Sequence, residues 1–243
     1  MVSEKEAWDI SKKFSDGIAD IIGSHLKAVI VIGSLAGGYY RPGISDIDTA
    51  IIVDDECSEE LKIQVRKVAT FFRDKFDIPK DFGAVVIKEQ ELIPPYDPTL
   101  ELVPEILRLK HQGVIVEGTY DLRNIPEPTN EDFKSYAQVF YPWLKRNYID
   151  SRPNEARTID ATINTLLYEL RLFLWDVQNE YVFNKMDVLR RFMTHHESHY
   201  FSSTLENVEK YLKGSVTHVT IEEVERTLNH ISMFVREKVN WLR

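Results

Sequence analysis

The chain has 243 residues, enough for one large domain or two modest ones. Its net charge of −9 argues against general nucleic-acid binding, which needs a basic surface that displaces counterions from phosphates. The sequence lacks an apolar run of about eighteen residues, so it predicts no membrane span. A single cysteine, Cys57, cannot form an internal disulfide, and with the polar N-terminus it predicts a cytoplasmic protein.

The first half of the chain alternates predicted helices and strands. Apolar residues recur every three or four positions in the predicted helices, which span residues 4–22, 61–76 and 100–109. Short apolar runs predict strands at residues 28–32, 50–53, 82–87 and 113–117. We expect Pro104 to kink or shorten the third helix. This alternation is typical of an α/β layer.

The second half has a helical pattern throughout. A Pro-containing connector at residues 124–130 separates the halves, which places the predicted domains at residues 1–124 and 125–243. Helices are expected at 133–148, at 156–181, around Phe192 and Met193, at 201–212, and after Thr220, which begins a capping box with Glu223. The apolar stripe of the last helix either closes the bundle or joins two copies, so monomer and homodimer both remain open.

The most informative stretch lies between the first two predicted strands. Gly33 and Ser34 form a turn after the first strand, and Asp46 and Asp48 stand one residue apart where the second begins. The two-residue period of extended chain puts both carboxylates on one face, where they repel each other unless a cation lies between them. Mg²⁺ suits this position, because it is usually held by one or two carboxylates together with substrate phosphates. Backbone N–H groups of the turn can hold phosphate, so the stretch predicts a metal-nucleotide site.

This pattern resembles that of the nucleotidyltransferase superfamily, which includes the aminoglycoside nucleotidyltransferases. The family pattern is hydrophobic-Gly-Ser, about a dozen residues, and Asp-hydrophobic-Asp before a hydrophobic strand. Here it reads Ile32-Gly33-Ser34 and Asp46-Ile47-Asp48, and Ser45 also fits. The resemblance implies an α/β (α+β) domain with a mixed sheet, followed by an all-α helical bundle. The alternative is an ordinary turn followed by two solvated aspartates.

The resemblance also implies roles for these residues. Asp46 and Asp48 would bind Mg²⁺ and act as catalytic residues, while Ser34 and the N–H groups near Gly33 would hold the β- and γ-phosphates of a nucleoside triphosphate. Ser45 is included with these phosphate-binding residues because it fits the family pattern.

Two cations are further candidates for phosphate contacts. Arg41 lies in the loop between the two halves of the motif, and a solvated loop arginine explains it equally well. Lys185 follows the longest apolar helix, in a context where aminoglycoside-modifying relatives have a lysine that contacts the triphosphate. A surface lysine at a helix end is an equally good interpretation of Lys185.

One expected acid is missing. Family members usually carry a third carboxylate on a neighbouring strand, but the matching strand 82–87 contains none, and Gly83 stands where the acid often stands. Asp81 shares the alternation of Gly83 and is our preferred third catalytic residue, against an exposed turn aspartate. Glu101 and Glu105 are alternative bases.

The sequence therefore predicts a Mg²⁺-dependent nucleotidyltransferase. We expect it to move a nucleoside monophosphate, with ATP as the donor, to a hydroxyl of a small molecule. An aminoglycoside-like acceptor agrees with the domain layout and the acidic charge. One alternative is transfer to a protein or RNA, as in toxin-antitoxin pairs. The other is a non-catalytic, nucleotide-binding regulatory module, which the missing acid suggests.

Overall fold

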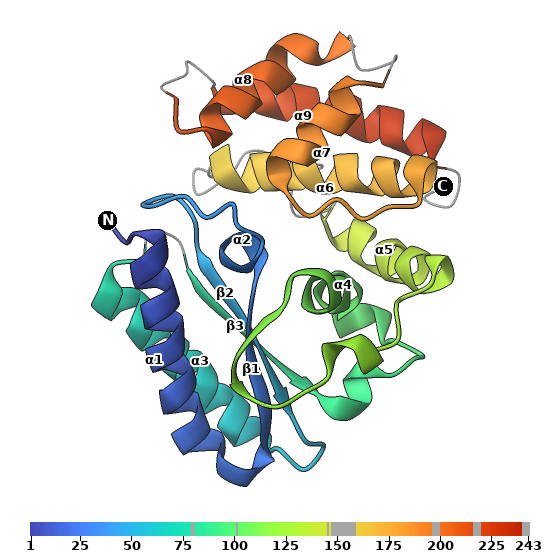
Figure 1. Ribbon diagram of the computed structural model, residues 1–243. Helices are drawn as coiled ribbons and strands as arrows, with labels where there is room; N and C mark the ends of the chain where they lie inside the picture. The colour runs from blue at the N-terminus through green and yellow to red at the C-terminus, as the bar shows by residue number, and fades with distance from the viewer. Residues whose placement is uncertain are drawn as a thin grey trace. The chain divides into compact units, whose positions relative to one another are not determined.

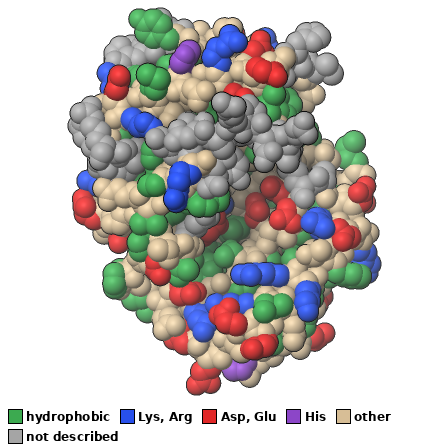
Figure 2. Space-filling view, turned by 180° about the vertical axis from the view of Figure 1, so that it is seen from behind, with side chains coloured by type: hydrophobic (Ala, Val, Ile, Leu, Met, Phe, Trp, Pro, Cys, Tyr) green, Lys and Arg blue, Asp and Glu red, His purple; other side chains and the backbone are tan. Residues whose placement is uncertain are grey.

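The computed structural model describes residues 1–78, 81–100, 102–144, 146, 159–195, 200–215 and 220–239. The chain divides into two units, Met1–Thr129 and Asn130–Arg243, and Figure 1 shows a sheet with flanking helices in the first and helices in the second. None of the helices in the described ranges has the length and apolarity needed to cross a bilayer. On the face shown in Figure 2, basic and acidic side chains of the described residues are interspersed.

A four-stranded mixed sheet organises the first unit, with the strand order β3-β2-β1-β4 (Figure 1). The strands are β1 (Leu26–Ile32), β2 (Ile47–Val53), β3 (Phe82–Lys88) and β4 (Val114–Gly118). β1 runs antiparallel to both β2 and β4, whereas β2 and β3 run parallel. The predicted mixed sheet is confirmed. β2 begins at Ile47 rather than at Ala50, because its first residues are polar at alternate positions and no apolar run marks them.

Helices cover both faces of this sheet. The helices of the first unit are α1 (Glu4–Ile22), α2 (Gly33–Ala36), α3 (Glu59–Phe76) and α4 (Leu102–Gln112), and short 3-10 segments span Gly23–His25, Glu89–Leu92, Pro98–Leu100 and Leu122–Asn124. Figure 1 shows α1 and α3 on one face and α4 on the other. Pro104 lies in the first turn of α4, where its missing N–H removes no helical hydrogen bond, so it neither kinks nor shortens the helix.

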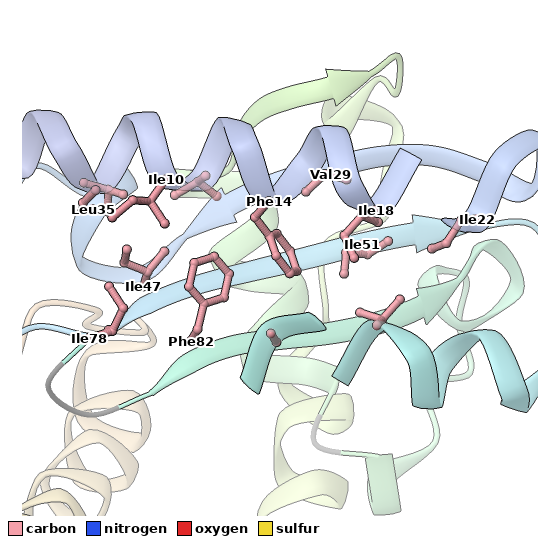
Figure 3. Packing of buried hydrophobic residues seen from close by; sticks show 14 of the residues in the cluster. Ile10, Phe14, Ile18, Ile22, Val29, Leu35, Ile47, Ile51, Ile78 and Phe82 are labelled. Atoms are coloured by element: carbon pink, nitrogen blue, oxygen red, sulfur yellow. The ribbon is translucent and has the colours of Figure 1, made fainter. Parts of the chain in front are cut away.

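The main core of the first unit lies between the sheet and the α1–α3 layer. Phe14 of α1 is fully buried. Its ring centroid lies 4.5 Å from the ring centroid of Phe82 and 5.5 Å from that of Phe72. Figure 3 shows Ile47 of β2 in the same core, near Phe82 and α1. Because Ile47 points into this core, its neighbours along the strand point to the opposite face of the sheet.

The second unit is helical within the described residues. Its helices are α5 (Asn130–Leu144), α6 (Ile159–Gln178), α7 (Lys185–Met193), α8 (Ser202–Leu212) and α9 (Ile221–Lys238). The predicted capping box of α9 is confirmed, since Thr220 Oγ1 accepts from the Glu223 N–H and the Glu223 carboxylate accepts from the Thr220 N–H. The apolar stripe of α9 is buried within this unit, where the helix packs on α6. Of the two alternatives, the observed packing is the one in which the apolar stripe of α9 closes the bundle.

A buried acid lies within this helical unit. The side chain of Glu169, on α6, is fully buried, and neither carboxylate oxygen makes a hydrogen bond of ordinary geometry to the described residues. Burial raises the pKa of this carboxyl to about 7, although Tyr141, Ser232 and Arg236 act in the opposite direction. The acid is therefore protonated in the fold over a range where the unfolded chain releases its proton.

We expect Glu169→Gln to remove part of the pH dependence of stability. The stability that the bound proton contributes is fully present below the ordinary pKa of 4.5 and is lost as the pH rises through 7. Between pH 5 and pH 8 the wild type should lose about 2 kcal/mol of unfolding free energy relative to the variant, measured by urea denaturation. Glu206→Gln, at an exposed site on α8, is the control. Equal pH dependence in wild type and Glu169→Gln would contradict this interpretation.

Candidate functional site

Asp46 and Asp48 lie at the start of β2, on the face opposite the α1–α3 core. Both are half-buried, and Ile47 between them is completely buried. Asp48 pairs with Ile32 of β1 on one side and with Gly83 of β3 on the other. Asp46 comes immediately before β2, so strand alternation places its side chain on the same side of the sheet as that of Asp48.

Two glycines make room for the carboxylate of Asp48. A Cβ atom at Gly33 would overlap Asp48 Oδ2, and a Cβ atom at Gly83 would lie only 2.8 Å from Asp48 Oδ1. Gly33 also has a φ of +69°, a conformation that favours glycine. The Thr49 hydroxyl donates to the Gly83 carbonyl at 2.9 Å and fixes β3 against β2 here. Gly83 thus lacks an acid because a side chain there would displace Asp48.

A pocket of about 500 Å³ opens beside Asp48. Its lining comes from β1, β2, β3 and α4, and includes Ile32, Asp48, Thr49, Gly83, Glu105 and Arg108. Glu105 Oε1 accepts a hydrogen bond from Arg108 Nη1 at 2.7 Å, one turn along α4. Sequence reasoning named Glu105 only as an alternative and missed Arg108, because nothing in the order of residues brings α4 to Asp48.

The loop before β2 is closed by Ser45. Its Oγ accepts from the Arg41 N–H at 3.0 Å, and its own N–H donates to the Arg41 carbonyl at 2.9 Å. These bonds fix the path of the chain into Asp46. The carboxylate of Asp46 adds to the effect of burial in raising the pKa of the Tyr40 phenol, which places Tyr40 beside this loop. The observed bonds therefore give Ser45 a structural role.

The turn after β1 is the short helix α2, and Ser34 lies in it. Its Oγ is buried and has no hydrogen-bond partner among the described residues. A buried hydroxyl that lacks a partner carries a desolvation cost that a ligand oxygen would relieve. This observation favours Ser34 as a contact for a bound group.

Three further candidates are not among the residues that line the Asp48 pocket. Asp81 is exposed at the start of β3, and its Oδ1 accepts from the Phe82 N–H at 2.8 Å. Lys185 begins α7 in the second unit, and its Nζ donates to Asn164 Oδ1 at 3.0 Å. Glu101 lies outside the described residues. The roles of Asp81 and Lys185 stay predictions.

The two aspartates would supply only part of the coordination of a metal ion. Within the ranges that the structure describes, no group of three or more His, Cys, Asp or Glu side chains is placed to bind an ion by itself. Two carboxylates on one face nevertheless fit Mg²⁺, which commonly takes one or two protein carboxylates, substrate phosphates and water. The donor set therefore suits a metal that arrives with a phosphorylated ligand.

The family model of the nucleotidyltransferase domain matches residues 11–117, which contain the whole sheet up to Glu117 and both aspartates. The first unit carries a nucleotidyltransferase domain. The predicted resemblance and the predicted enzyme class are thereby confirmed. A search of curated proteins found no significant match to the chain.

Solved structures show the same fold. Spectinomycin adenyltransferase AAD(9) from Enterococcus faecialis, crystallised with ATP and spectinomycin, is 17% identical, with a TM-score of 0.69 over 92% of this chain and 97% of that one. A toxin-antitoxin structure with AMP-PNP is 15% identical, with a TM-score of 0.32 over 56% of this chain and 90% of that one. The first comparison shows the same fold, a mixed-sheet domain followed by a helical domain, and the second carries no argument.

We expect Gly33→Ala to destabilise the fold by on the order of 1–3 kcal/mol. The alanine would have to adopt the left-handed backbone conformation of Gly33, and its Cβ atom would clash with the carboxylate of Asp48. Gly17→Ala is the matched control: Gly17 lies within α1, a Cβ there meets nothing within 4 Å, and alanine favours helix. Urea denaturation of both variants measures the difference. A Gly33→Ala variant as stable as the Gly17→Ala variant would show that Asp48 does not need the space at Gly33.

Proposed function

We propose that this nucleotidyltransferase moves a nucleoside monophosphate from a nucleoside triphosphate, with ATP as the donor, to a hydroxyl group of a small molecule. The observation that carries the proposal is the carboxylate of Asp48, held between Gly33 and Gly83 at the edge of a pocket. Asp46 shares its face of the sheet. A carboxylate that lines a pocket, with a second carboxylate two residues before it, suits a metal-nucleotide complex within a nucleotidyltransferase domain.

In this proposal Asp46 and Asp48 bind Mg²⁺. The ion, when bound, supplies positive charge that stabilises the negative charge developing on the α-phosphate and on the leaving pyrophosphate. The buried Ser34 hydroxyl donates to a phosphate oxygen, and the turn at Gly33 brings backbone N–H groups to the same phosphates. Ser45 holds Arg41 and the loop in place, and Arg41 and Lys185 supply cations for the triphosphate.

The acceptor is proposed to be an aminoglycoside-like cation. Two observations support this choice: the net charge of −9, which attracts cationic molecules, and the fold shared with an adenyltransferase crystallised with spectinomycin. The second observation is a likeness of fold at 17% identity, so it guides the choice of test compounds.

One observation favours a second function. Strand β3 carries no acid beside Asp48, which agrees with a regulatory module that binds nucleotide without transferring it. Such a module would bind Mg²⁺-ATP and release no pyrophosphate with any acceptor. Pyrophosphate release by the wild type therefore separates the two functions.

We expect Asp46→Asn and Asp48→Asn each to lower the transfer rate by about 10²-fold or more, since each removes a charge that holds the metal. Mg²⁺-dependent ATP binding, measured by calorimetry, should weaken in both variants, and pyrophosphate release with spectinomycin and a panel of aminoglycosides measures the rate. Asp54→Asn is the matched control, because Asp54 follows the other end of β2 and pairs with His25.

Wild-type activity in Asp46→Asn or Asp48→Asn would contradict the proposed metal site. Unchanged ATP binding in both variants, with and without Mg²⁺, would place the nucleotide elsewhere. Loss of activity in Asp54→Asn as well would point to a general effect of changing β2.

A further inference from the structure

Strand β3 has no acid beside Asp48, and the position that faces Asp48 is crowded. Gly83 is the residue that pairs with Asp48 across the parallel strands, and a Cβ atom there would lie 2.8 Å from Asp48 Oδ1. That distance is shorter than a van der Waals contact, so a side chain at Gly83 would displace the carboxylate that the proposed site needs. Since β3 itself carries no acid, a carboxylate that accepts the proton of the acceptor hydroxyl would come from another element.

Asp81 is poorly placed to receive this proton. Its side chain is exposed, its Oδ1 accepts from the Phe82 N–H, and it does not line the pocket beside Asp48. Strand alternation puts it on the same face as Gly83, but two residues earlier along β3.

Glu105 has the placement that Asp81 lacks. It lines the same pocket as Asp48 and Gly83, and it comes from α4, which covers this face of the sheet. Its Oε1 is fixed by the 2.7 Å hydrogen bond from Arg108. Its Oε2 is buried and has no hydrogen-bond partner among the described residues. One oxygen thus orients the carboxylate, and the other remains available to accept a proton.

We infer that Glu105 is the catalytic base of this enzyme, an inference that rests on the proposed function. The acceptor oxygen forms a bond to the α-phosphorus, and the bond from the α-phosphorus to the bridging oxygen of pyrophosphate breaks. The electron pair of that bond leaves with pyrophosphate, and the acceptor's hydroxyl proton passes to Glu105 Oε2. α4 thereby supplies the acid that the packing of Gly83 against Asp48 excludes from β3.

Steady-state kinetics of Glu105→Gln test this role. Pyrophosphate release is followed with Mg²⁺-ATP and the acceptor, from spectinomycin and the aminoglycoside panel, that gives the fastest wild-type rate. Loss of a general base should lower kcat by about 10²–10⁴-fold, and the KM for ATP should change by less than about threefold.

Two further variants separate catalysis from structure. Glu105→Asp keeps a carboxylate in the pocket, so it should recover part of the rate. Glu127→Gln is the control. It removes an exposed carboxylate that pairs with His111 of α4 at 3.1 Å, and it should leave kcat unchanged. Calorimetry with Mg²⁺-ATP shows that each variant is folded and binds the donor.

The outcomes distinguish the inference from the proposed function. A wild-type kcat in Glu105→Gln would overturn the inference and leave the proposed function standing. Equal losses in Glu105→Gln and Glu105→Asp, with weakened ATP binding in both, would assign Glu105 a structural role and also overturn it. A wild type that releases no pyrophosphate with any acceptor would overturn the proposed function, and the inference with it.

Discussion

The pairing of β2 between β1 and β3 is the constraint on which the site depends. Ile47 packs into the core beneath α1, and this contact fixes which face of the strand turns inward. A slip of one residue would bury the aspartates and expose Ile47, at a large cost in free energy. The hydrophobic core that stabilises the domain therefore also aims the two carboxylates, so fold and site are specified by the same residues.

The second consequence of this register is the crowding around Asp48. Gly33 follows β1 on one side and Gly83 faces the carboxylate on the other, so the backbones approach closely where a side chain would not fit. This close approach fixes Asp48 and removes β3 as a source of a third acid. The pocket therefore draws its remaining charged groups, Glu105 and Arg108, from α4.

Much of this structure follows from local sequence signals. The spacing of Phe14 and its neighbours predicts α1 with its observed bounds, and the Asp-Ile-Asp pattern predicts two carboxylates on one face. The role of Gly83 and the approach of Glu105 were not predictable in this way. They depend on a parallel pairing between strands far apart in the chain and on where α4 packs, which no local pattern encodes.

The most direct test of the account is a crystal structure with Mn²⁺ and a non-hydrolysable ATP analogue, in which anomalous scattering locates the metal. We expect Mn²⁺ to be bound to carboxylate oxygens of Asp46 and Asp48 and to phosphate oxygens of the nucleotide, with the α-phosphate turned toward the pocket that Glu105 lines. Mn²⁺ and nucleotide bound away from these aspartates, or nucleotide bound at the site without metal, would contradict it.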